Sequence, residues 1–160
     1  MKATLRTRSA AETERAGGLL APALAPGDVV ALTGDLGAGK TRLVQGVARG
    51  LGVEEPVTSP TFNLLLVHPG VLPLYHFDLY RLERESELED IGFFETLESD
   101  GASIIEWGDR FPAALPDDRL VVRIERTGDT ARVLEIDASG ARSEALASEW
   151  LERCHAEGLS

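Results

Sequence analysis

The sequence predicts an α/β domain in which helices flank a central, mainly parallel sheet that is extended by an antiparallel hairpin. Three observations support this fold class. A short apolar, partly β-branched run at 29–33 is typical of a buried parallel strand, and a glycine-rich turn and a helical pattern follow it directly. Further short strand-like runs occur at 72–78 and 102–106. Close to the C-terminal end, two segments of alternating hydrophobicity predict a hairpin.

The length of the chain and its net charge limit the number of domains and the kinds of partner that we expect. The chain has 160 residues, and we expect 1–160 to form one domain with its own core. Its formal charge of −11 disfavours an independent grip on phosphate backbones, because Lys and Arg supply that affinity. We therefore expect no DNA binding. The only lysines are Lys2 and Lys40, against 14 arginines, so we ask of each lysine whether it has a functional role.

Compartment and membrane contact can also be predicted. Cys154 is the only cysteine, which excludes an intramolecular disulfide, and a chemically idle thiol is the expected role. The slightly basic segment 1–8 leads into polar residues instead of an apolar signal core. No apolar run approaches the roughly 18 residues of a membrane span. We expect a soluble, cytoplasmic protein with no membrane contact.

The first elements follow from capping and periodicity. Ser9 and Glu12 form a capping box in which each side chain would satisfy the other's backbone amide, and this predicts a helix over about 10–24. The strand at 29–33 comes next. After the glycine-rich turn, a helical pattern over 40–51 ends at a glycine.

The middle of the chain predicts an extended loop, short strands and an acidic helical segment. Residues 54–61 carry two prolines and predict an extended loop, and 62–67 and 72–78 predict two strands. The segment 83–100 holds eight acidic residues among apolar ones, which predicts one or two short amphipathic helices. Its acids form either a solvated helix face or a docking surface for a basic partner. A brief strand is expected at 102–106.

The last third of the chain predicts the hairpin and a closing helix. Segments 120–126 and 131–138 alternate apolar and charged residues, and a polar turn at 127–130 joins them. A helix is expected over about 141–157.

The turn after the strand at 29–33 matches the pattern G-x-x-x-x-G-K-[ST]. It consists of Gly34, Asp35, Leu36, Gly37, Ala38, Gly39, Lys40 and Thr41. Glycines let successive N–H groups turn inward around a polyphosphate, and the lysine ammonium reaches the β and γ oxygens. The threonine hydroxyl binds Mg²⁺, and the following helix points its positive end at the anion. The sequence therefore predicts a P-loop NTPase-like fold that binds a nucleotide through these residues.

Two carboxylates end predicted strands. Asp78 ends the strand at 72–78, and Glu106 ends the strand at 102–106. The carboxyl ends of strands in an open α/β sheet face the ligand crevice, so both acids can face the same Mg²⁺-nucleotide. Taken singly, such an acid is more often a turn residue. The residues alone do not decide which of the two would contact Mg²⁺ and which would orient water.

Two further features lie close to the predicted site. Trp107 follows Glu106 directly, where a core role competes with stacking on the nucleotide base. The loop Thr58-Ser59-Pro60-Thr61 follows the predicted P-loop helix, and one of its hydroxyls could sense a γ-phosphate, as switch segments do. Three scattered histidines and one cysteine form no zinc pattern.

Several segments together resemble one family, the bacterial P-loop ATPase TsaE of tRNA threonylcarbamoyladenosine synthesis. They spread over about half of the chain, in the family's order and spacing. They are Gly34-Asp-Leu-Gly-Ala-Gly-Lys-Thr41, Ser59-Pro-Thr-Phe62, Tyr75-His-Phe-Asp-Leu-Tyr-Arg81, Leu88-Glu-Asp-Ile-Gly92 and Glu106-Trp107. The segment that begins at Tyr75, with the later Glu-Trp pair, is the most specific. One departure is Gly108-Asp109, where the family more often has Ala or Pro before the acid.

The resemblance implies a function and assigns roles. The protein would bind ATP/ADP and Mg²⁺ and would act as an ATPase on a separate TsaD–TsaB synthase complex, meeting tRNA only through it. Lys40 and Thr41 would hold phosphate and Mg²⁺, and Asp78 and Glu106 would be the metal-site and catalytic acids. Thr61 would belong to a switch-like loop, and Trp107 would stack near the base. No arginine is obviously placed as a cis finger, so we expect slow hydrolysis without the partner.

Two other functions remain possible from the residues. A small-molecule P-loop kinase would need an acceptor pocket and an arginine-bearing lid, and no arginine-rich segment suggests one. A nucleotide-gated binding module would keep Lys40 but need no catalytic acid. A GTPase is disfavoured, because Asp78 is followed by Leu-Tyr-Arg instead of the D-x-x-G pattern and no N-K-x-D reader occurs.

Overall fold

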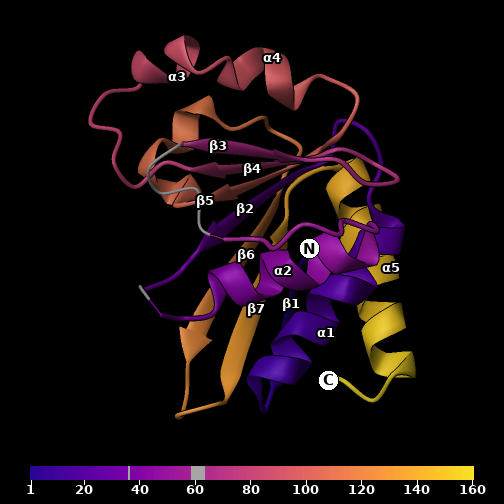
Figure 1. The fold of residues 1–160 in the computed structure, drawn as a ribbon. Helices are drawn as coiled ribbons and strands as arrows, with labels where there is room; N and C mark the ends of the chain where they lie inside the picture. The colour runs from indigo at the N-terminus through magenta and orange to yellow at the C-terminus, as the bar shows by residue number, and fades with distance from the viewer. Residues whose placement is uncertain (36, 59–63) are drawn as a thin grey trace.

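The computed structural model describes residues 1–35, 37–58 and 64–160. Within these residues one sheet of seven strands has the spatial order β1-β7-β6-β2-β5-β4-β3 (Figure 1). The strands are β1 Lys2–Thr7, β2 Val29–Thr33, β3 Leu65–His68, β4 Leu74–Asp78, β5 Ala102–Glu106, β6 Leu120–Arg126 and β7 Arg132–Ala138.

The centre of the sheet is parallel and its edges are antiparallel. Strands β6, β2, β5 and β4 run parallel to their neighbours, β7 and β1 continue the sheet in antiparallel fashion, and β3 pairs antiparallel with β4. The predicted α/β class is therefore confirmed, including the hairpin at 120–138. Because the four central strands share one direction, their carboxyl ends lie along one edge of the sheet.

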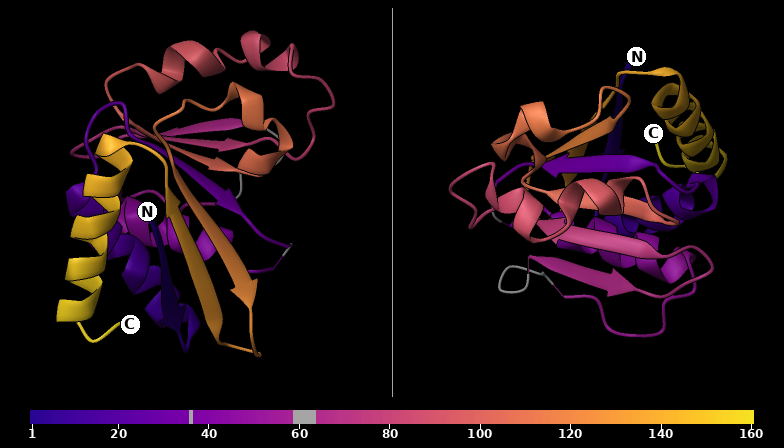
Figure 2. Two further views of the ribbon diagram at one scale, coloured as in Figure 1. Left: turned by 180° about the vertical axis from the view of Figure 1, so that it is seen from behind. Right: turned by 90° about the horizontal axis from the view of Figure 1, so that it is seen from above.

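Helices cover both faces of this sheet (Figures 1 and 2). On one face lie α1 Ala10–Leu20, α2 Lys40–Gly50 and α5 Ala141–Ala156, packed on a large apolar cluster. On the other face the short helices α3 Glu87–Asp90 and α4 Phe93–Leu97 cover a smaller cluster. The acidic segment thus forms two short helices, as predicted.

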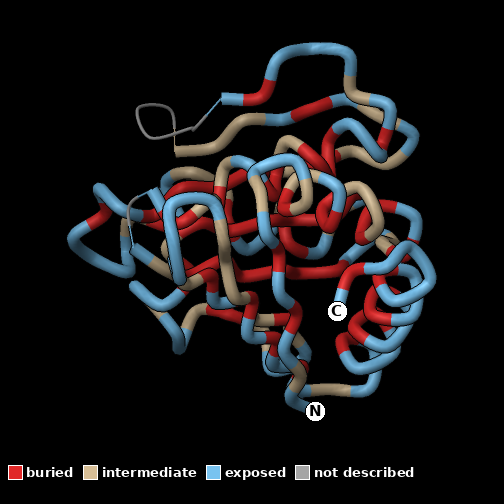
Figure 3. The backbone as a smooth tube through the Cα atoms, turned by 90° about the horizontal axis from the view of Figure 1, so that it is seen from below, coloured by how far each residue is buried: buried red, intermediate tan, exposed pale blue. Residues whose placement is uncertain are grey.

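The core lies on the central strands. Every residue of β2 and β5 is buried, which is expected of parallel strands covered on both faces. In Figure 3 the buried residues accordingly lie in the middle of the molecule, and the loops around its margins are exposed.

The pairing of β4 with β5 sets the positions of the site acids. Leu74 lies opposite Ala102 at one end of the ladder, and Asp78 lies opposite Glu106 at the other. The Ala102 N–H also donates to the Pro73 carbonyl at 3.0 Å, which ties the starts of the two strands together. The parallel register therefore brings two acids that are distant in sequence to one sheet edge.

The N-terminal cap of α1 differs from the predicted box in one respect. Ser9 Oγ accepts the Glu12 N–H at 3.1 Å, as predicted. The Glu12 carboxylate, however, accepts the Arg8 N–H at 3.0 Å, one residue before the expected partner. The helix is also shorter than expected, because a 3-10 turn, Ala21–Ala23, replaces its last residues at Pro22.

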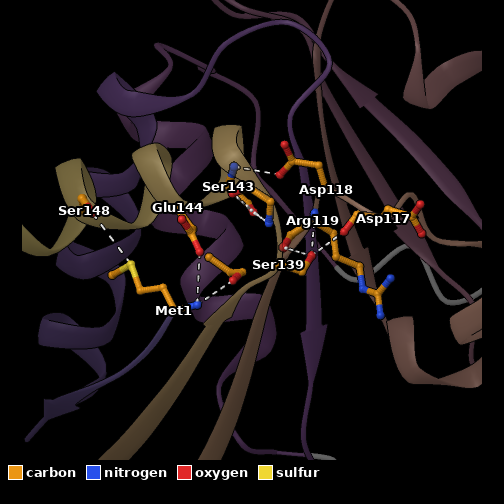
Figure 4. Close-up of polar contacts among 10 residues, drawn as sticks. Met1, Asp117, Asp118, Arg119, Ser139, Ser143, Glu144 and Ser148 are labelled. Carbon is orange, nitrogen blue, oxygen red and sulfur yellow. Dashed lines mark hydrogen bonds and ion pairs between the residues drawn. The ribbon is translucent and has the colours of Figure 1, made fainter.

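The closing helix α5 is anchored at its start and in its second half. Asp118 accepts the N–H groups of Arg142 and Ser143 at 2.9 and 2.8 Å, and Figure 4 shows its carboxylate directed at the start of the helix. A side-chain hydrogen bond with Ser143, together with these backbone hydrogen bonds, lowers the pKa of Asp118. Farther along, the fully buried Trp150 donates its indole N–H to the Ala16 carbonyl of α1 at 2.8 Å. The helix therefore packs against α1 through an indole that has its polar partner.

Strand β1 is an element that the sequence analysis missed. It pairs with β7 along its whole length. Only Leu5 is both large and buried in it, so the alternation was too weak to indicate a strand. The strand expected at 62–67 falls partly on residues 59–63, which lie outside the described residues, and its described part is β3.

The remaining expectations concern membranes and Cys154. Among the described residues, no helix combines the length and the apolar character needed to cross a membrane. Cys154 is buried on α5, and burial raises the pKa of its thiol to about 11. A protonated, buried thiol is a poor nucleophile, in agreement with the idle role expected for it.

Helices α1 and α2 approach closely through glycines, which leads to a stability prediction. A Cβ added at Gly46 would lie 1.8 Å from the Glu14 carbonyl oxygen, whereas a Cβ at Gly18 would meet its nearest neighbour at 3.6 Å. We expect Gly46→Ala to lower the free energy of unfolding by about 3 kcal/mol through overpacking. The matched Gly18→Ala should be neutral or raise it by up to about 1 kcal/mol, because alanine favours helix. Urea unfolding of both variants checks this, and an unchanged midpoint for Gly46→Ala would contradict it.

Candidate active site

The phosphate-binding motif lies between β2 and α2, as its sequence context required. Gly34 has φ 133° and Gly39 has φ 111°, backbone conformations that residues with a Cβ rarely adopt. At Gly34 a Cβ would also lie 2.4 Å from the Ile124 carbonyl oxygen of β6. Position 36 of the motif lies outside the described residues. The described part has the glycine-dependent turn and the helix start that a phosphate cradle needs.

Lys40, the first residue of α2, is buried at the centre of the site. Its ammonium donates to the carbonyl oxygens of Gly34 and Asp35 at 2.6 and 3.0 Å. Burial lowers the pKa of Lys40, and the nearby carboxylates of Glu106 and Asp78 oppose this shift. The lysine that stood out in an arginine-rich sequence is therefore a positive charge facing both predicted site acids.

Asp78 and Glu106 lie next to each other at the ends of β4 and β5. Each of the two residues is only 3% exposed, which is unusual for residues that carry a carboxylate. Asp78 Oδ1 accepts the Tyr80 N–H at 3.0 Å, and Glu106 Oε2 lies 2.5 Å from Nε2 of His76. The two acids predicted from separate strand ends are thus brought to one place, each held by a hydrogen bond.

Trp107 adopts a conformation that an L-residue avoids. Its φ of 60° is left-handed, which costs roughly 1–2 kcal/mol for a residue with a Cβ. Its N–H donates to the Leu32 carbonyl at 3.0 Å, and the ring packs on Tyr80 with centroids 4.9 Å apart. The Lys40 ammonium lies 4.4 Å from the centre of the indole ring. The bend turns the indole toward Lys40.

The Gly108 that departs from the family pattern has a packing reason here. A Cβ at this position would lie 2.6 Å from the Cβ of Ala31 on β2. Glycine therefore suits the close approach of this loop to the sheet.

These groups line one cavity of about 560 Å³, which is within the usual size range of small-molecule sites. The P-loop, the strand ends, the start of α1 and the β6–β7 hairpin all contribute to its wall. The lining residues are Ala10, Thr13, Gly37, Gly39, Lys40, Thr41, Arg42, Gln45, Asp78, Tyr80, Glu106, Trp107, Asp129, Thr130 and Arg132.

Arg132 is a site residue that sequence analysis missed. It lies at the start of β7, and its Nε donates to the Ala38 carbonyl at 2.7 Å while one terminal nitrogen lies 3.5 Å from the Gly37 carbonyl oxygen. The guanidinium thus binds the carbonyl side of the P-loop, which favours a loop whose N–H groups face the ligand. No local pattern marks Arg132, because it meets the loop only through tertiary packing.

We expect Arg132→Ala to weaken ADP binding about tenfold, because the loop loses charge-assisted hydrogen bonds worth roughly 1.5 kcal/mol. Isothermal titration with ADP checks this. Arg123→Ala is the matched control, since Arg123 lies in the same hairpin, is exposed and pairs with Glu125. Equal affinities for the wild type and Arg132→Ala, or an equal loss with Arg123→Ala, would contradict the prediction.

The donor set fits Mg²⁺. No cluster of three or more His, Cys, Asp or Glu side chains that could hold an ion occurs in the described ranges. Mg²⁺, however, is usually held by one or two carboxylates together with substrate phosphates and water. Asp78, Glu106 and the hydroxyl of Thr41, which line the same cavity, supply oxygen donors of that kind.

The described residues therefore bring together most of the predicted site: Gly34, Asp35, Gly37, Ala38, Gly39, Lys40, Thr41, Asp78, Glu106 and Trp107. The predictions for Leu36 and Thr61 fall on residues outside the described ranges. Thr58, the first residue of the predicted switch loop, is exposed.

The chain is similar to known proteins of one family. A family model described as "Threonylcarbamoyl adenosine biosynthesis protein TsaE" matches residues 7–134. A Bacillus subtilis protein named tRNA threonylcarbamoyladenosine biosynthesis protein TsaE is 44% identical over 145 residues, covering 90% of each chain. A Treponema pallidum protein of the same name is 42% identical over 130 residues, covering 81% of this chain and 96% of its own. The crystal structure of Bacillus subtilis YdiB superposes with a TM-score of 0.83 at 37% identity, over 95% of both chains.

Proposed function

Since the chain belongs to the TsaE family, we propose that it binds and hydrolyses ATP in support of tRNA threonylcarbamoyladenosine synthesis. The relatives carry that pathway in their names. The observation that carries the ATPase proposal is the cavity in which the P-loop lysine faces two buried carboxylates. In this proposal the protein acts on a TsaD–TsaB synthase complex and meets tRNA only through it.

The chain's own groups suggest how hydrolysis proceeds. The N–H groups of the P-loop and the start of α2 bind the phosphates, and the Lys40 ammonium leaves its carbonyl partners to neutralise the β and γ oxygens. Asp78 and Glu106 divide the tasks of holding Mg²⁺ and orienting the attacking water, and Thr41 adds its hydroxyl to the metal side. When bound, Mg²⁺ neutralises the charge on the phosphate oxygens.

Trp107 belongs to the phosphate end of the cavity in this proposal. Its ring lies against the Lys40 ammonium, which a P-loop uses for the β and γ phosphates. This geometry favours a contact near the phosphates over the stacking on the base that the family resemblance implied. The ribose and base would then lie toward Thr13 of α1 and Thr130 of the hairpin, which line the rest of the cavity.

Fluorescence separates these two positions for Trp107. We expect ADP and inorganic pyrophosphate to change the tryptophan emission, and adenosine to leave it unchanged. Trp107→Phe is the control, because it leaves only Trp150, which is fully buried between α5 and α1. A response to adenosine and none to pyrophosphate would show that Trp107 stacks on the base instead.

The proposed function is tested by phosphate release in the presence and absence of the TsaD–TsaB complex. Slow hydrolysis alone and a marked stimulation by the complex are expected, together with dependence of the reconstituted tRNA modification on this protein and ATP. Phosphoryl transfer to a metabolite would indicate the kinase alternative instead. Modification that survives the loss of hydrolysis but needs nucleotide binding would indicate a nucleotide-gated module.

A further inference from the structure

A fully buried histidine lies behind one of the two site carboxylates. His76 is 0% exposed on β4, and its Nε2 lies 2.5 Å from Oε2 of Glu106 on β5. Asp78, two residues after His76, is the direct ladder partner of Glu106. Side chains two residues apart on a strand share a face, so His76, Asp78 and Glu106 all project from the same side of the sheet.

The chemistry of the pair gives the direction of the hydrogen bond. An ionised carboxylate offers only acceptors, so the imidazole must carry its proton on Nε2 and donate it to Glu106. Nδ1 of His76 has no hydrogen-bond partner among the described residues. Within that part of the chain, the hydrogen-bonding capacity of the ring is directed at Glu106 alone.

The residues that pair with His76 in the sheet offer no polar side chain. The ladder partners of His76 are Leu66 on β3 and Ile104 on β5, both apolar. The terminal torsion of a glutamate is broad, so an unheld carboxylate would sample many orientations. The hydrogen bond from His76 engages Oε2 and leaves Oε1 for the cavity that Glu106 lines.

We propose that His76 is a positioning residue for ATP hydrolysis, whose Nε2–H holds the Glu106 carboxylate in its working orientation. This inference rests on the proposed ATPase function. His76 is not among the residues that line the cavity, so it acts through Glu106 and does not touch the nucleotide. Hydrogen-bonding partners behind metal-ligating groups commonly contribute 10- to 100-fold to metal affinity or activity, and we expect an effect of that size for His76.

The test compares two substitutions at His76. His76→Gln keeps an N–H donor close to the position of Nε2, and His76→Leu removes it at a similar volume. His68→Leu is the matched control, because His68 is also buried, on the neighbouring strand, with its ring centroid 6.2 Å from that of His76. Phosphate release is measured on the full chain, alone and with the TsaD–TsaB complex, and melting temperatures and ADP affinities are recorded for each variant.

We expect the loss of the His76 donor to lower kcat and leave KM unchanged, and an N–H donor at the same position to restore kcat. His76→Leu should lower kcat by about 10- to 100-fold while KM and ADP affinity stay within about twofold. His76→Gln should recover most of the lost kcat, and His68→Leu should match the wild type. In a Glu106→Gln background, His76→Leu should bring no further loss, because residues that act as a unit are not additive.

Other outcomes overturn the inference and identify what failed. Equal kcat for wild type and His76→Leu, equal losses for the Leu and Gln variants, or an additive loss in the Glu106→Gln background would each show that His76 does not act through Glu106. In those cases an active wild type would leave the ATPase proposal intact. A wild type that releases no phosphate even with the complex would overturn both.

Discussion

Replacing Lys40 by methionine is expected to reduce ATP hydrolysis by at least about 10²–10³-fold and to weaken ADP binding. Methionine keeps the length of the buried side chain that packs on Trp107 but removes the charge. A preorganised cation at developing phosphate charge is worth several kcal/mol in a site of this kind. Phosphate release and isothermal titration with ADP measure the two losses.

The chain offers a direct control for this prediction. Lys2 is the only other lysine and lies exposed on the edge strand β1, so Lys2→Met should retain full activity. Lys40→Arg should not rescue, because a planar guanidinium does not replace a compact ammonium in this buried position. Hydrolysis by Lys40→Met at the wild-type rate would reject the P-loop as the phosphate site.

The second large effect is expected at the paired carboxylates. Glu106→Gln and Asp78→Asn should each lower kcat by about 10²–10⁴-fold, the range associated with a lost acid or base or metal contact. Both keep the size of the side chain and remove its charge beside Lys40. Because Lys40 loses one neighbouring carboxylate that favours its charged form, its pKa should fall further in each variant.

A Mg²⁺ titration of the two variants assigns the roles that the residues alone leave open. The variant that needs more Mg²⁺ for half-maximal activity has lost the metal contact, and the one with an unchanged Mg²⁺ requirement has lost the water-orienting group. Glu135→Gln, at an exposed position on β7, is the control and should behave as the wild type. Wild-type kcat in both site variants would remove these acids from the mechanism.

Much of this site could be predicted because its signals are local. The P-loop is a contiguous pattern whose glycines are required by the backbone itself, as the positive φ angles of Gly34 and Gly39 demonstrate. Asp78 and Glu106 were found because strand ends can be recognised from apolar runs, and parallel strands end at the same edge.

The features that the sequence did not reveal arise from contacts between distant segments. Arg132 reaches the P-loop only because the β6–β7 hairpin packs beside it, and an arginine at the start of a strand carries no local signal of that contact. His76 was part of a recognised motif, but its pairing with Glu106 depends on the register of β4 and β5. Strand β1 carries only a short, weak alternation, and its pairing with β7, which completes the strand, is not visible in the sequence.

The β4–β5 ladder also affects how harmful substitutions in this protein should be interpreted. A slip of one residue would turn Asp78 or Glu106 to the opposite face of the sheet, away from Lys40. The start of this ladder, where Gly101 approaches the Pro73 carbonyl so closely that a Cβ would lie 2.2 Å from its oxygen, is about 17 Å of strand away from Glu106. A variant found there in a genetic screen would therefore mimic a catalytic lesion, although the altered residue lies at the far end of the sheet.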